Sequence, residues 1–194
     1  VTSSGEIVDF ELTEMLDIEV FRSKLSTQFP ADLPIYRVEA IDLATPAATQ
    51  LLDRAEYFVT VQGLLPDEPR PDITLAEMPW QEWVTAILAC ESLWQEQTTK
   101  SGKKQQINLR ERLFELSWLK NADIFLGDHG MSPVGVLGSE SSIATLRYIG
   151  SCRNDGTLLR PDHLISMLES FAQQEFQILR IHRQQLFLQN PMSR

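Results

Sequence analysis

The fold is organised around KSGKKQQINLRERLFELSW, residues 100–118, in which a basic turn runs directly into a segment with apolar residues at regular spacing. Ser101-Gly102 stands between two mostly polar runs, residues 92–99 and 104–109. Two extended runs joined by a short turn with glycine are typical of a β-hairpin. The sequence therefore predicts a hairpin whose lysines gather at its tip.

The same stretch separates an acidic part of the chain from a mildly basic one. Residues 1–97 contain 5 Lys or Arg against 18 Asp or Glu, a net charge of −13, whereas residues 98–194 contain 12 against 9, a net charge of +3. The net charge of −10 for the whole chain opposes nonspecific binding to nucleic acid. Any anion-binding site is therefore expected in the second part.

Working outward, alternation of apolar and polar residues predicts strands, and apolar spacing of three and four predicts helices. The predicted strands are residues 6–14, 33–43, 55–62, 117–125 and 143–149. The predicted helices are residues 18–29, capped by Asp17, then 47–52, 80–90 and 161–168, with one or two helical turns over 109–116. The pattern of residues 176–188 fits either a final strand or a short helix.

This order of elements favours an α+β fold, a two-layer sandwich of the ferredoxin-like (split β-α-β) type, with a duplication into two such halves left open. Residues 64–79 contain four prolines and four acidic residues, a composition that neither a helix nor a central strand tolerates. We interpret them as a linker between an N-terminal β-α-β subdomain, residues 1–63, and a C-terminal α+β subdomain, residues 80–194.

Composition limits the class of protein. No apolar run approaches the roughly 20 residues that span a bilayer, so no membrane partner is expected. Cys90 and Cys152 are the two cysteines and form no CxxC pair, which favours a reducing compartment, the cytoplasm by default. The chain begins at Val1 without an initiator Met, which suggests a piece of a longer protein.

Few residues have the spacing of catalytic or metal-binding motifs. The cysteines and histidines are scattered singly, so neither a zinc site nor the CxxxCxxC cluster motif is expected in this chain. Asp128-His129 lies in a glycine-rich stretch, residues 127–142, and could transfer protons in a hydrolytic enzyme. We rank that hypothesis last, since no nucleophile accompanies the pair.

The cationic residues of the second part are the main candidates for a binding site. Arginine binds phosphate through two parallel hydrogen bonds, so several arginines on one face could hold an RNA backbone or another anion. The candidate set is Lys100, Lys103, Lys104, Arg110, Arg112, Arg147, Arg153, Arg160, Arg180 and Arg183. The opposing interpretation of the lysines is solvation of the hairpin tip.

Several segments together resemble one known family. Residues 3–14, SSGEIVDFELTE, are followed by Leu16-Asp17 and are similar to the family pattern S-x-x-E-Y-L-D-I-E-L-T-E…L-D. Four later segments occur in the family's order: AEYFVTV (55–61), INLR (107–110), GTLLRP (156–161) and IHR (181–183). The family is the radical-SAM-linked domain of unknown function found at the C-terminus of cobalamin-binding-type radical SAM proteins.

The resemblance implies a noncatalytic accessory domain that helps to bind or position a substrate or partner. The upstream radical SAM core of the same polypeptide would hold the iron–sulfur cluster, S-adenosylmethionine and, where used, cobalamin, and this chain would hold no cofactor. The candidate recognition face comprises Arg110, Arg160 and Arg183, and the further binding candidates are Asn108, His182, Lys103 and Lys104. Asn108 departs from the family pattern, which often has Asp there. The alternative function is a ferredoxin-like RNA-binding module acting in RNA modification or processing.

Overall fold

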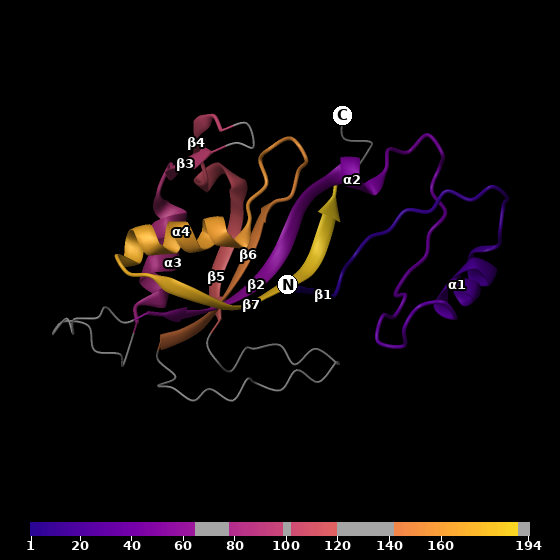
Figure 1. The fold of residues 1–194 in the computed structure, drawn as a ribbon, viewed down its shortest axis with the longest axis horizontal. Helices are drawn as coiled ribbons and strands as arrows, with labels where there is room; N and C mark the ends of the chain where they lie inside the picture. Colours follow the sequence, from indigo (N-terminus) through magenta and orange to yellow (C-terminus); the bar gives the residue numbers. More distant parts are fainter. Residues whose placement is uncertain (65–77, 99–101, 120–141, 190–194) are drawn as a thin grey trace.

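The computed structural model describes residues 1–64, 78–98, 102–119 and 142–189, which form a five-stranded sheet, a separate hairpin and four α-helices (Figure 1). The sheet strands are β1 (Thr2–Ser3), β2 (Leu52–Gly63), β5 (Leu113–Leu119), β6 (Ile143–Ser151) and β7 (Phe176–Leu188). The hairpin strands are β3 (Trp94–Thr98) and β4 (Lys104–Asn108). The helices are α1 (Ile18–Ser26), α2 (Ala48–Leu51), α3 (Trp80–Ala89) and α4 (Pro161–Ala172), with a 3₁₀ turn, η1 (Arg110–Arg112).

The predicted fold class is confirmed. Apart from the hairpin β3–β4 and η1, which lie between α3 and β5, the elements β2, α3, β5, β6, α4 and β7 follow one another in β-α-β-β-α-β order. The strands of the sheet lie in the order β1-β7-β2-β6-β5. The pairs β2–β6, β2–β7 and β5–β6 are antiparallel. This is the split β-α-β arrangement, with β1 added in parallel to the outer edge of β7.

The sheet draws β2 from before the predicted linker and its other long strands from after it. The described ranges contain one split β-α-β unit, which runs from β2 to β7. The linker itself, except for its ends, lies outside the described residues. The division at residues 64–79 therefore stays a prediction.

The core lies between the sheet and helices α3 and α4, as the alternating burial of β2 shows. Val59 and Val61 point into this layer together with Leu146 of β6, and all three side chains are fully buried. Fully burying one such side chain contributes about 1.5–3 kcal/mol of hydrophobic stabilisation. The two helices therefore pack on one face of the sheet, and the β2 residues between these positions lie on the opposite face.

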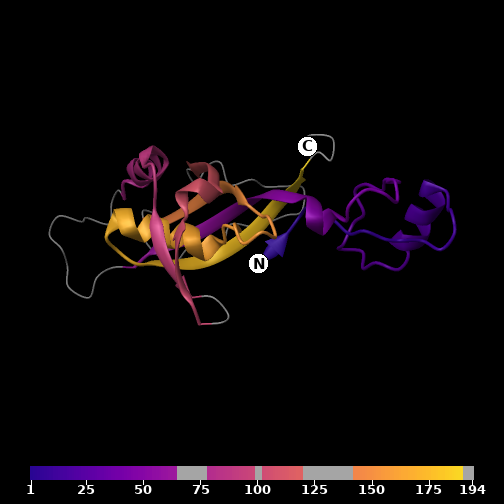
Figure 2. The ribbon, with the colours of Figure 1, turned by 90° about the horizontal axis from the view of Figure 1, so that it is seen from above.

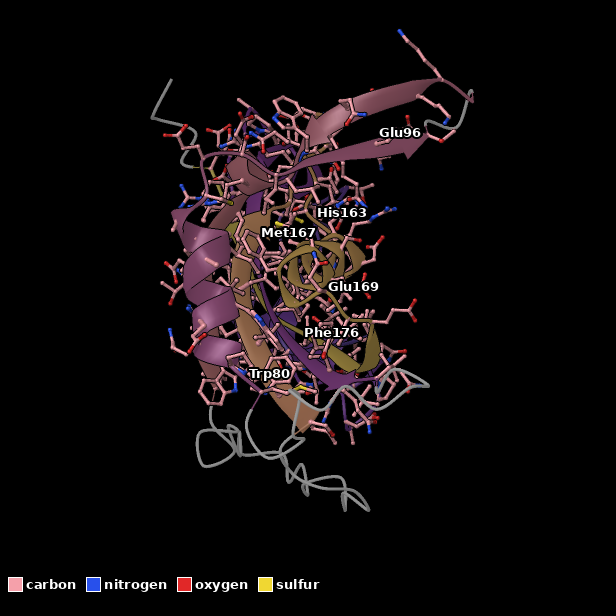
Figure 3. All side chains as sticks on the ribbon, turned by 90° about the vertical axis from the view of Figure 1, so that its left-hand side faces the viewer. Trp80, Glu96, His163, Met167, Glu169 and Phe176 are labelled. Atoms are coloured by element: carbon pink, nitrogen blue, oxygen red, sulfur yellow. The ribbon has the colours of Figure 1, made fainter. Side chains whose placement is uncertain are left out.

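Aromatic side chains close one end of the core (Figure 3). Trp80 at the start of α3 lies beside Phe176 at the start of β7, with ring centroids 5.5 Å apart, and Trp83 contacts both rings. Each such ring pair adds about 0.5–1.5 kcal/mol beyond the burial of its area. Trp80 is thus a core residue, and Trp83 is partly buried against the core.

Residues 4–47 form a lobe that extends away from the sheet (Figures 1 and 2). The predicted strands at 6–14 and 33–43 are wrong, because neither segment has strand structure. An alternating pattern yields a strand only where a neighbouring strand can accept its backbone hydrogen bonds. Of the N-terminal residues 1–47, Thr2 and Ser3 are the two that pair with β7 as a strand, and the chain then leaves the sheet.

Helix α1 of this lobe is confirmed, with Asp17 as its N-cap accepting hydrogen bonds from Glu19 N and Val20 N. Phe21 of α1 packs edge-to-face with Phe10, with ring centroids 5.7 Å apart. No residue of α1 is buried, however, and many apolar side chains of the lobe remain exposed. The exposed ones are Ile7, Val8, Phe10, Leu12, Met15, Leu16, Ile18, Val20, Leu33, Tyr36, Ile41 and Leu43.

Two other segments, residues 109–116 and 176–188, refine the predictions. The helical turns predicted over 109–116 shorten to η1, after which β5 starts at Leu113, four residues before the predicted strand. Residues 176–188 form strand β7, which settles the alternative left open by the sequence. Asp128-His129, with most of the glycine-rich stretch, lies outside the described residues. None of the helices within the described ranges is long and apolar enough to cross a membrane.

Candidate functional site

Arg110 lies at the junction between α3 and β5. Its Nη2 donates to the carbonyl oxygen of Leu88 at 3.1 Å and its Nη1 to that of Leu113 at 2.9 Å. The Nε atom is buried and has no hydrogen-bond partner among the described residues. Carbonyls at the end of a helix are left without backbone partners, so Arg110 caps α3 and ties it to β5. Both terminal nitrogens of the guanidinium are thereby used inside the protein.

Asn108 at the end of β4 uses both ends of its amide. Its Oδ1 accepts from the backbone nitrogens of Leu93 and Arg110 at 2.9 and 3.2 Å, and its Nδ2 donates to Glu111 Oε1 at 2.8 Å. Aspartate has no donor for Glu111 and would place two carboxylates in contact. Asn108, where the family pattern often has Asp, is therefore suited to its partner Glu111, because the amide can donate a hydrogen bond to that carboxylate.

Arg160 precedes α4 and forms an ion pair with Asp162 at 3.1 Å, while its Nη2 lies 3.1 Å from His163 Nε2. Burial lowers the pKa of His163, and the charge of Arg160 acts in the same direction. His163 is therefore a neutral side chain at neutral pH. Arg160 stays half-exposed at the start of the helix.

His182 and Arg183 of β7 bind the N-terminal segment. Thr2 Oγ1 lies 2.8 Å from His182 Nδ1, and Ser4 Oγ lies 2.9 Å from His182 Nε2. On the opposite face of the strand, Arg183 forms an ion pair with Glu6, which raises the pKa of the guanidinium. We call these contacts the N-terminal clasp. They join residues 2–6 to His182 and Arg183, and so connect two of the segments that carry the family resemblance, 3–14 and 181–183.

The lysines at the hairpin lie apart from these contacts. Lys104 pairs with Glu96 at 2.7 Å across the hairpin, and both side chains are largely exposed. Lys103 is exposed as well. The hairpin projects from the body of the protein, with the labelled Glu96 far from Trp80 (Figure 3). The predicted binding residues thus belong to separate structural contacts, with Arg110, Arg160 and Arg183 each bound to its own partners.

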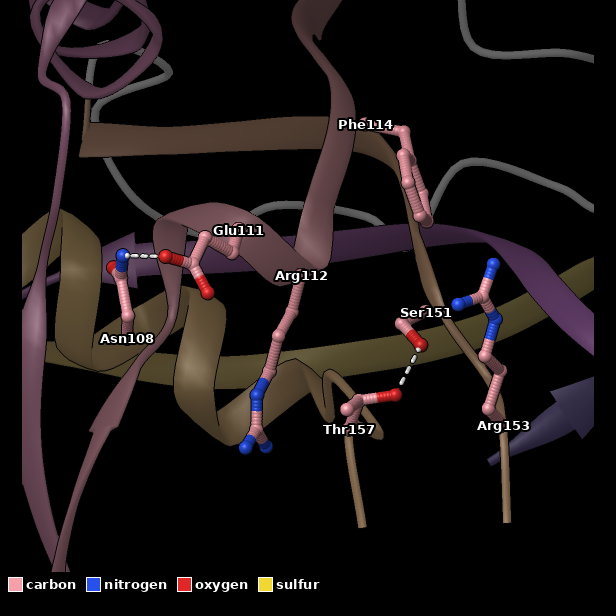
Figure 4. A pocket seen from close by; sticks show the side chains of 7 residues that line it. All are labelled: Asn108, Glu111, Arg112, Phe114, Ser151, Arg153 and Thr157. Atoms are coloured by element: carbon pink, nitrogen blue, oxygen red, sulfur yellow. Dashed lines mark hydrogen bonds between the residues drawn. The ribbon is translucent and has the colours of Figure 1, made fainter. Parts of the chain in front are cut away.

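A pocket of about 260 Å³ lies where η1, the start of β5 and the end of β6 meet (Figure 4). Its walls contain two arginines, an aromatic ring and several oxygen atoms. The lining residues are Asn108, Glu111, Arg112, Phe114, Ser151, Arg153 and Thr157. Two further family-like segments, 107–110 and 156–161, thus contribute a residue each to one cavity.

The two arginines of this pocket differ in their partners. Arg153 is bound to Asp53, with Nε and Nη2 at 2.7 and 2.5 Å from Oδ1. Arg112 donates from Nη1 to the carbonyl oxygen of Leu158 at 3.2 Å and has no ion pair among the described residues. Burial lowers the pKa of Arg112, although the nearby carboxylates of Asp155 and Glu111 act against that effect. Its charge is only partly compensated.

The hydroxyl groups of the pocket form a short relay. Thr157 Oγ1 donates to Asp155 Oδ1 at 2.5 Å and lies 3.0 Å from Ser151 Oγ. Because a hydroxyl has one proton, Ser151 donates to Thr157. The hydrogen bonds from the hydroxyl and backbone N–H of Thr157 lower the pKa of Asp155 and keep it ionised. Both hydroxyl oxygens therefore retain lone pairs and act as acceptors toward the pocket.

Sequence reasoning included Arg112 and Arg153 only in the broad cationic set and missed Phe114, Ser151 and Thr157. The proximity of the segments 107–114 and 151–157 results from the β5–β6 pairing, in which Leu113 lies opposite Gly150. The signal that could have pointed to the pocket is the position of Arg112 and Thr157 within or beside the family-like segments.

The arrangement is suited to binding an anion. Among the described residues, no group of three or more His, Cys, Asp or Glu side chains could hold a metal ion.

A family model described as an uncharacterized protein conserved in bacteria (DUF2344) matches residues 1–161. No match was found among curated proteins or among solved structures. Since the matched region spans most of the chain, from β1 to the start of α4, the chain belongs to the DUF2344 family.

Proposed function

We propose that this chain is a noncatalytic accessory domain of a cytoplasmic radical SAM protein, and that it binds and positions a substrate or partner of the parent enzyme. The observation that supports this function most directly is the pocket of Figure 4. Residues from two family-like segments line it, and its partly compensated Arg112 provides a binding group for a negatively charged ligand.

The N-terminal clasp supports the accessory role in a second way. His182 holds Thr2 and Ser4 on one face of β7, while Arg183 holds Glu6 on the other. Because residues 2–6 are bound on both faces of β7, this segment has a fixed direction relative to the sheet. A fixed entry direction is what a domain needs in order to present a bound substrate to a catalytic core in the same polypeptide.

In this proposal the iron–sulfur cluster, S-adenosylmethionine and any cobalamin are bound upstream of this chain. Such a cluster requires several cysteine thiolates. The two cysteines here, half-buried Cys90 and buried Cys152, are both free, and burial raises the pKa of the Cys152 thiol. The residues of this chain are therefore assigned to binding and orientation.

The test is made in the complete reading frame, where a CxxxCxxC motif is expected upstream. Arg112→Gln in the complete protein should raise the KM for its substrate by about 10-fold or more, because a charged hydrogen bond is worth about 1.5–3 kcal/mol. Arg37→Gln, an equal change of charge in the N-terminal lobe, is the matched control. A complete protein without the motif, or an unchanged KM in Arg112→Gln, would contradict the proposal.

A second candidate function, an RNA-binding module, is favoured by the face of the sheet opposite α3 and α4. On this face Phe58 of β2 lies in register between His182 of β7 and Arg147 of β6. Aromatic rings on a sheet face with cations beside them are the usual platform for single-stranded RNA. Arg147 is the cation beside Phe58, because burial lowers the pKa of His182 and that side chain is neutral at neutral pH. Arg147, however, is paired with both Glu56 and Glu115, which reduces its attraction for phosphate.

Binding of a single-stranded RNA at low salt tests this candidate. It predicts an affinity that falls steeply with salt and by about 10-fold in Phe58→Leu, since stacking of one base contributes about 1–3 kcal/mol. The same RNA-binding measurement on Arg110→Ala and Arg160→Ala tests the two arginines that the sequence predicts as RNA contacts, whose replacement should weaken the affinity. Absence of binding at low salt would rule out the module.

A further inference from the structure

The pocket of Figure 4 combines two arginines with several oxygen atoms that act as hydrogen-bond acceptors. Arg112 is the cation whose described partner is a carbonyl oxygen, so its remaining N–H groups are available to an anion. Arg153 adds positive charge from the opposite side, and its Nη1 has no hydrogen bond among the described residues. A phosphate group is a ligand that a guanidinium with available N–H groups binds through two parallel hydrogen bonds.

The acceptors restrict the rest of the ligand. The protons of Ser151 and Thr157 are committed within the relay to Asp155, and Glu111 uses Oε1 for Asn108. The free lone pairs of these oxygens therefore need donors on the ligand. Neighbouring sugar hydroxyls are such donors, whereas the inorganic phosphate dianion, HPO4²⁻, offers a single O–H group.

Phe114 completes the wall of the pocket. One face of its ring is covered by the Arg54 guanidinium, 4.3 Å from the ring centroid, and the side chain remains partly exposed. A planar base can pack against such a ring. Cation, hydroxyl acceptors and aromatic wall thus occur together in a cavity of about 260 Å³, small enough to select one sugar phosphate unit.

We infer that this pocket binds a 5′-ribonucleotide unit, with the phosphate on Arg112, the ribose hydroxyls toward Glu111 and Ser151, and the base beside Phe114. This inference rests on the proposed function, because it uses the same pocket and names the class of its substrate. The unit can be a free mononucleotide or the 5′-phosphorylated end of an RNA.

The test is isothermal titration of the 194-residue chain with five probes: AMP, dAMP, adenosine, inorganic phosphate and a 5′-phosphorylated RNA dinucleotide. AMP should bind about 10-fold more tightly than adenosine or inorganic phosphate, and several-fold more tightly than dAMP. If the RNA dinucleotide binds more tightly than AMP, the site is assigned to the end of an RNA. If the dinucleotide binds as tightly as AMP or more weakly, the site is assigned to a free nucleotide.

Arg112→Gln should weaken AMP binding by about 10-fold, Arg112→Lys by less, and Arg37→Gln by less than about twofold. Far-UV circular dichroism and thermal unfolding verify that each variant is folded. If Arg112→Gln does not fold, Arg112→Lys is used as the test variant in its place. Equal affinity in the folded Arg112 variants, or no binding of either AMP or the dinucleotide, overturns the inference. If that happens while Arg112→Gln still raises the KM of the complete protein, the proposed function stands and only the ligand class is wrong.

Discussion

Arg183 of β7 forms an ion pair with Glu6, which lies 177 positions earlier in the chain. The pair brings the start of the N-terminal lobe against the last strand of the sheet, beside His182 with its contacts to Thr2 and Ser4. Two short motifs at opposite ends of the sequence are therefore parts of one structural contact. Their shared role is to anchor the N-terminal segment to the sheet, which a description of each motif alone would not show.

Glu6→Gln should lower the free energy of unfolding by about 0.5–1 kcal/mol at pH 7, a small value because Glu6 is half-exposed. The hydrogen bond from Arg183 lowers the pKa of Glu6. A carboxyl whose pKa is lowered by folding stabilises the protein above its unfolded pKa, and this stability is lost as the pH falls through the folded pKa. The difference between wild type and variant in urea unfolding should therefore shrink as the pH falls below about 4 and vanish once the pH is below the folded pKa of Glu6. Glu14→Gln, in the same lobe, is the control.

Gly5→Ala tests how closely the lobe approaches the sheet. A Cβ at Gly5 would lie 2.8 Å from the carbonyl oxygen of Gln184 and 3.2 Å from the Cα of Gln185, and both are backbone atoms that cannot swing away. We expect residues 1–6 to detach from β7, with faster amide hydrogen exchange of Ser4 N, whose partner is Arg183 O. Unchanged protection of Ser4 in the variant would show that the approach is looser than described.

Arg110→Met should destabilise the domain by about 2–4 kcal/mol, because it removes two charged hydrogen bonds and leaves the carbonyls of Leu88 and Leu113 without these partners. Lys104→Met breaks only the exposed pair with Glu96 and should change stability by about 0.5 kcal/mol or less. Urea unfolding of both variants measures the difference. Equal small effects would mean that Arg110 is not a structural residue and would return it to the candidate recognition face.

Asn108→Asp should reduce stability by about 1–3 kcal/mol at pH 7, since it replaces the donor to Glu111 with a second carboxylate. Mutual repulsion raises the pKa of one carboxyl in the folded state above its unfolded value. The loss is therefore absent below about pH 4 and grows as the pH rises. Adding Glu111→Gln should restore most of the stability, and a double-mutant cycle without coupling would reject the contact.

The sequence predicts the split β-α-β class and most of its elements, because local patterns decide them. The β-branched run at 55–62 forms strand β2, and helix α4 begins at Pro161 as predicted. The same rule fails for residues 6–14, which alternate well but have no neighbouring strand to pair with. Strand formation depends on a partner elsewhere in the chain, and a local pattern contains no information about that partner.

The site is harder to predict than the fold for the same reason. Arg110 and Arg112 stand two positions apart in one basic stretch, yet the guanidinium of Arg110 is turned onto backbone carbonyls while Arg112 lines a pocket. Composition gives both the same weight. Only the pairing of β5 with β6 brings Arg112 toward Ser151 and Thr157 and distinguishes the candidate binding residue from the structural one.

Cleavage of S-adenosylmethionine, measured on this chain alone and on the complete protein with reconstituted iron–sulfur cluster, tests the central claim most directly. The accessory function predicts that the complete protein cleaves S-adenosylmethionine, whereas the 194-residue chain folds, binds no iron and has no activity. Cluster-dependent cleavage by the chain alone, or a complete protein that neither binds a cluster nor cleaves S-adenosylmethionine, would contradict it.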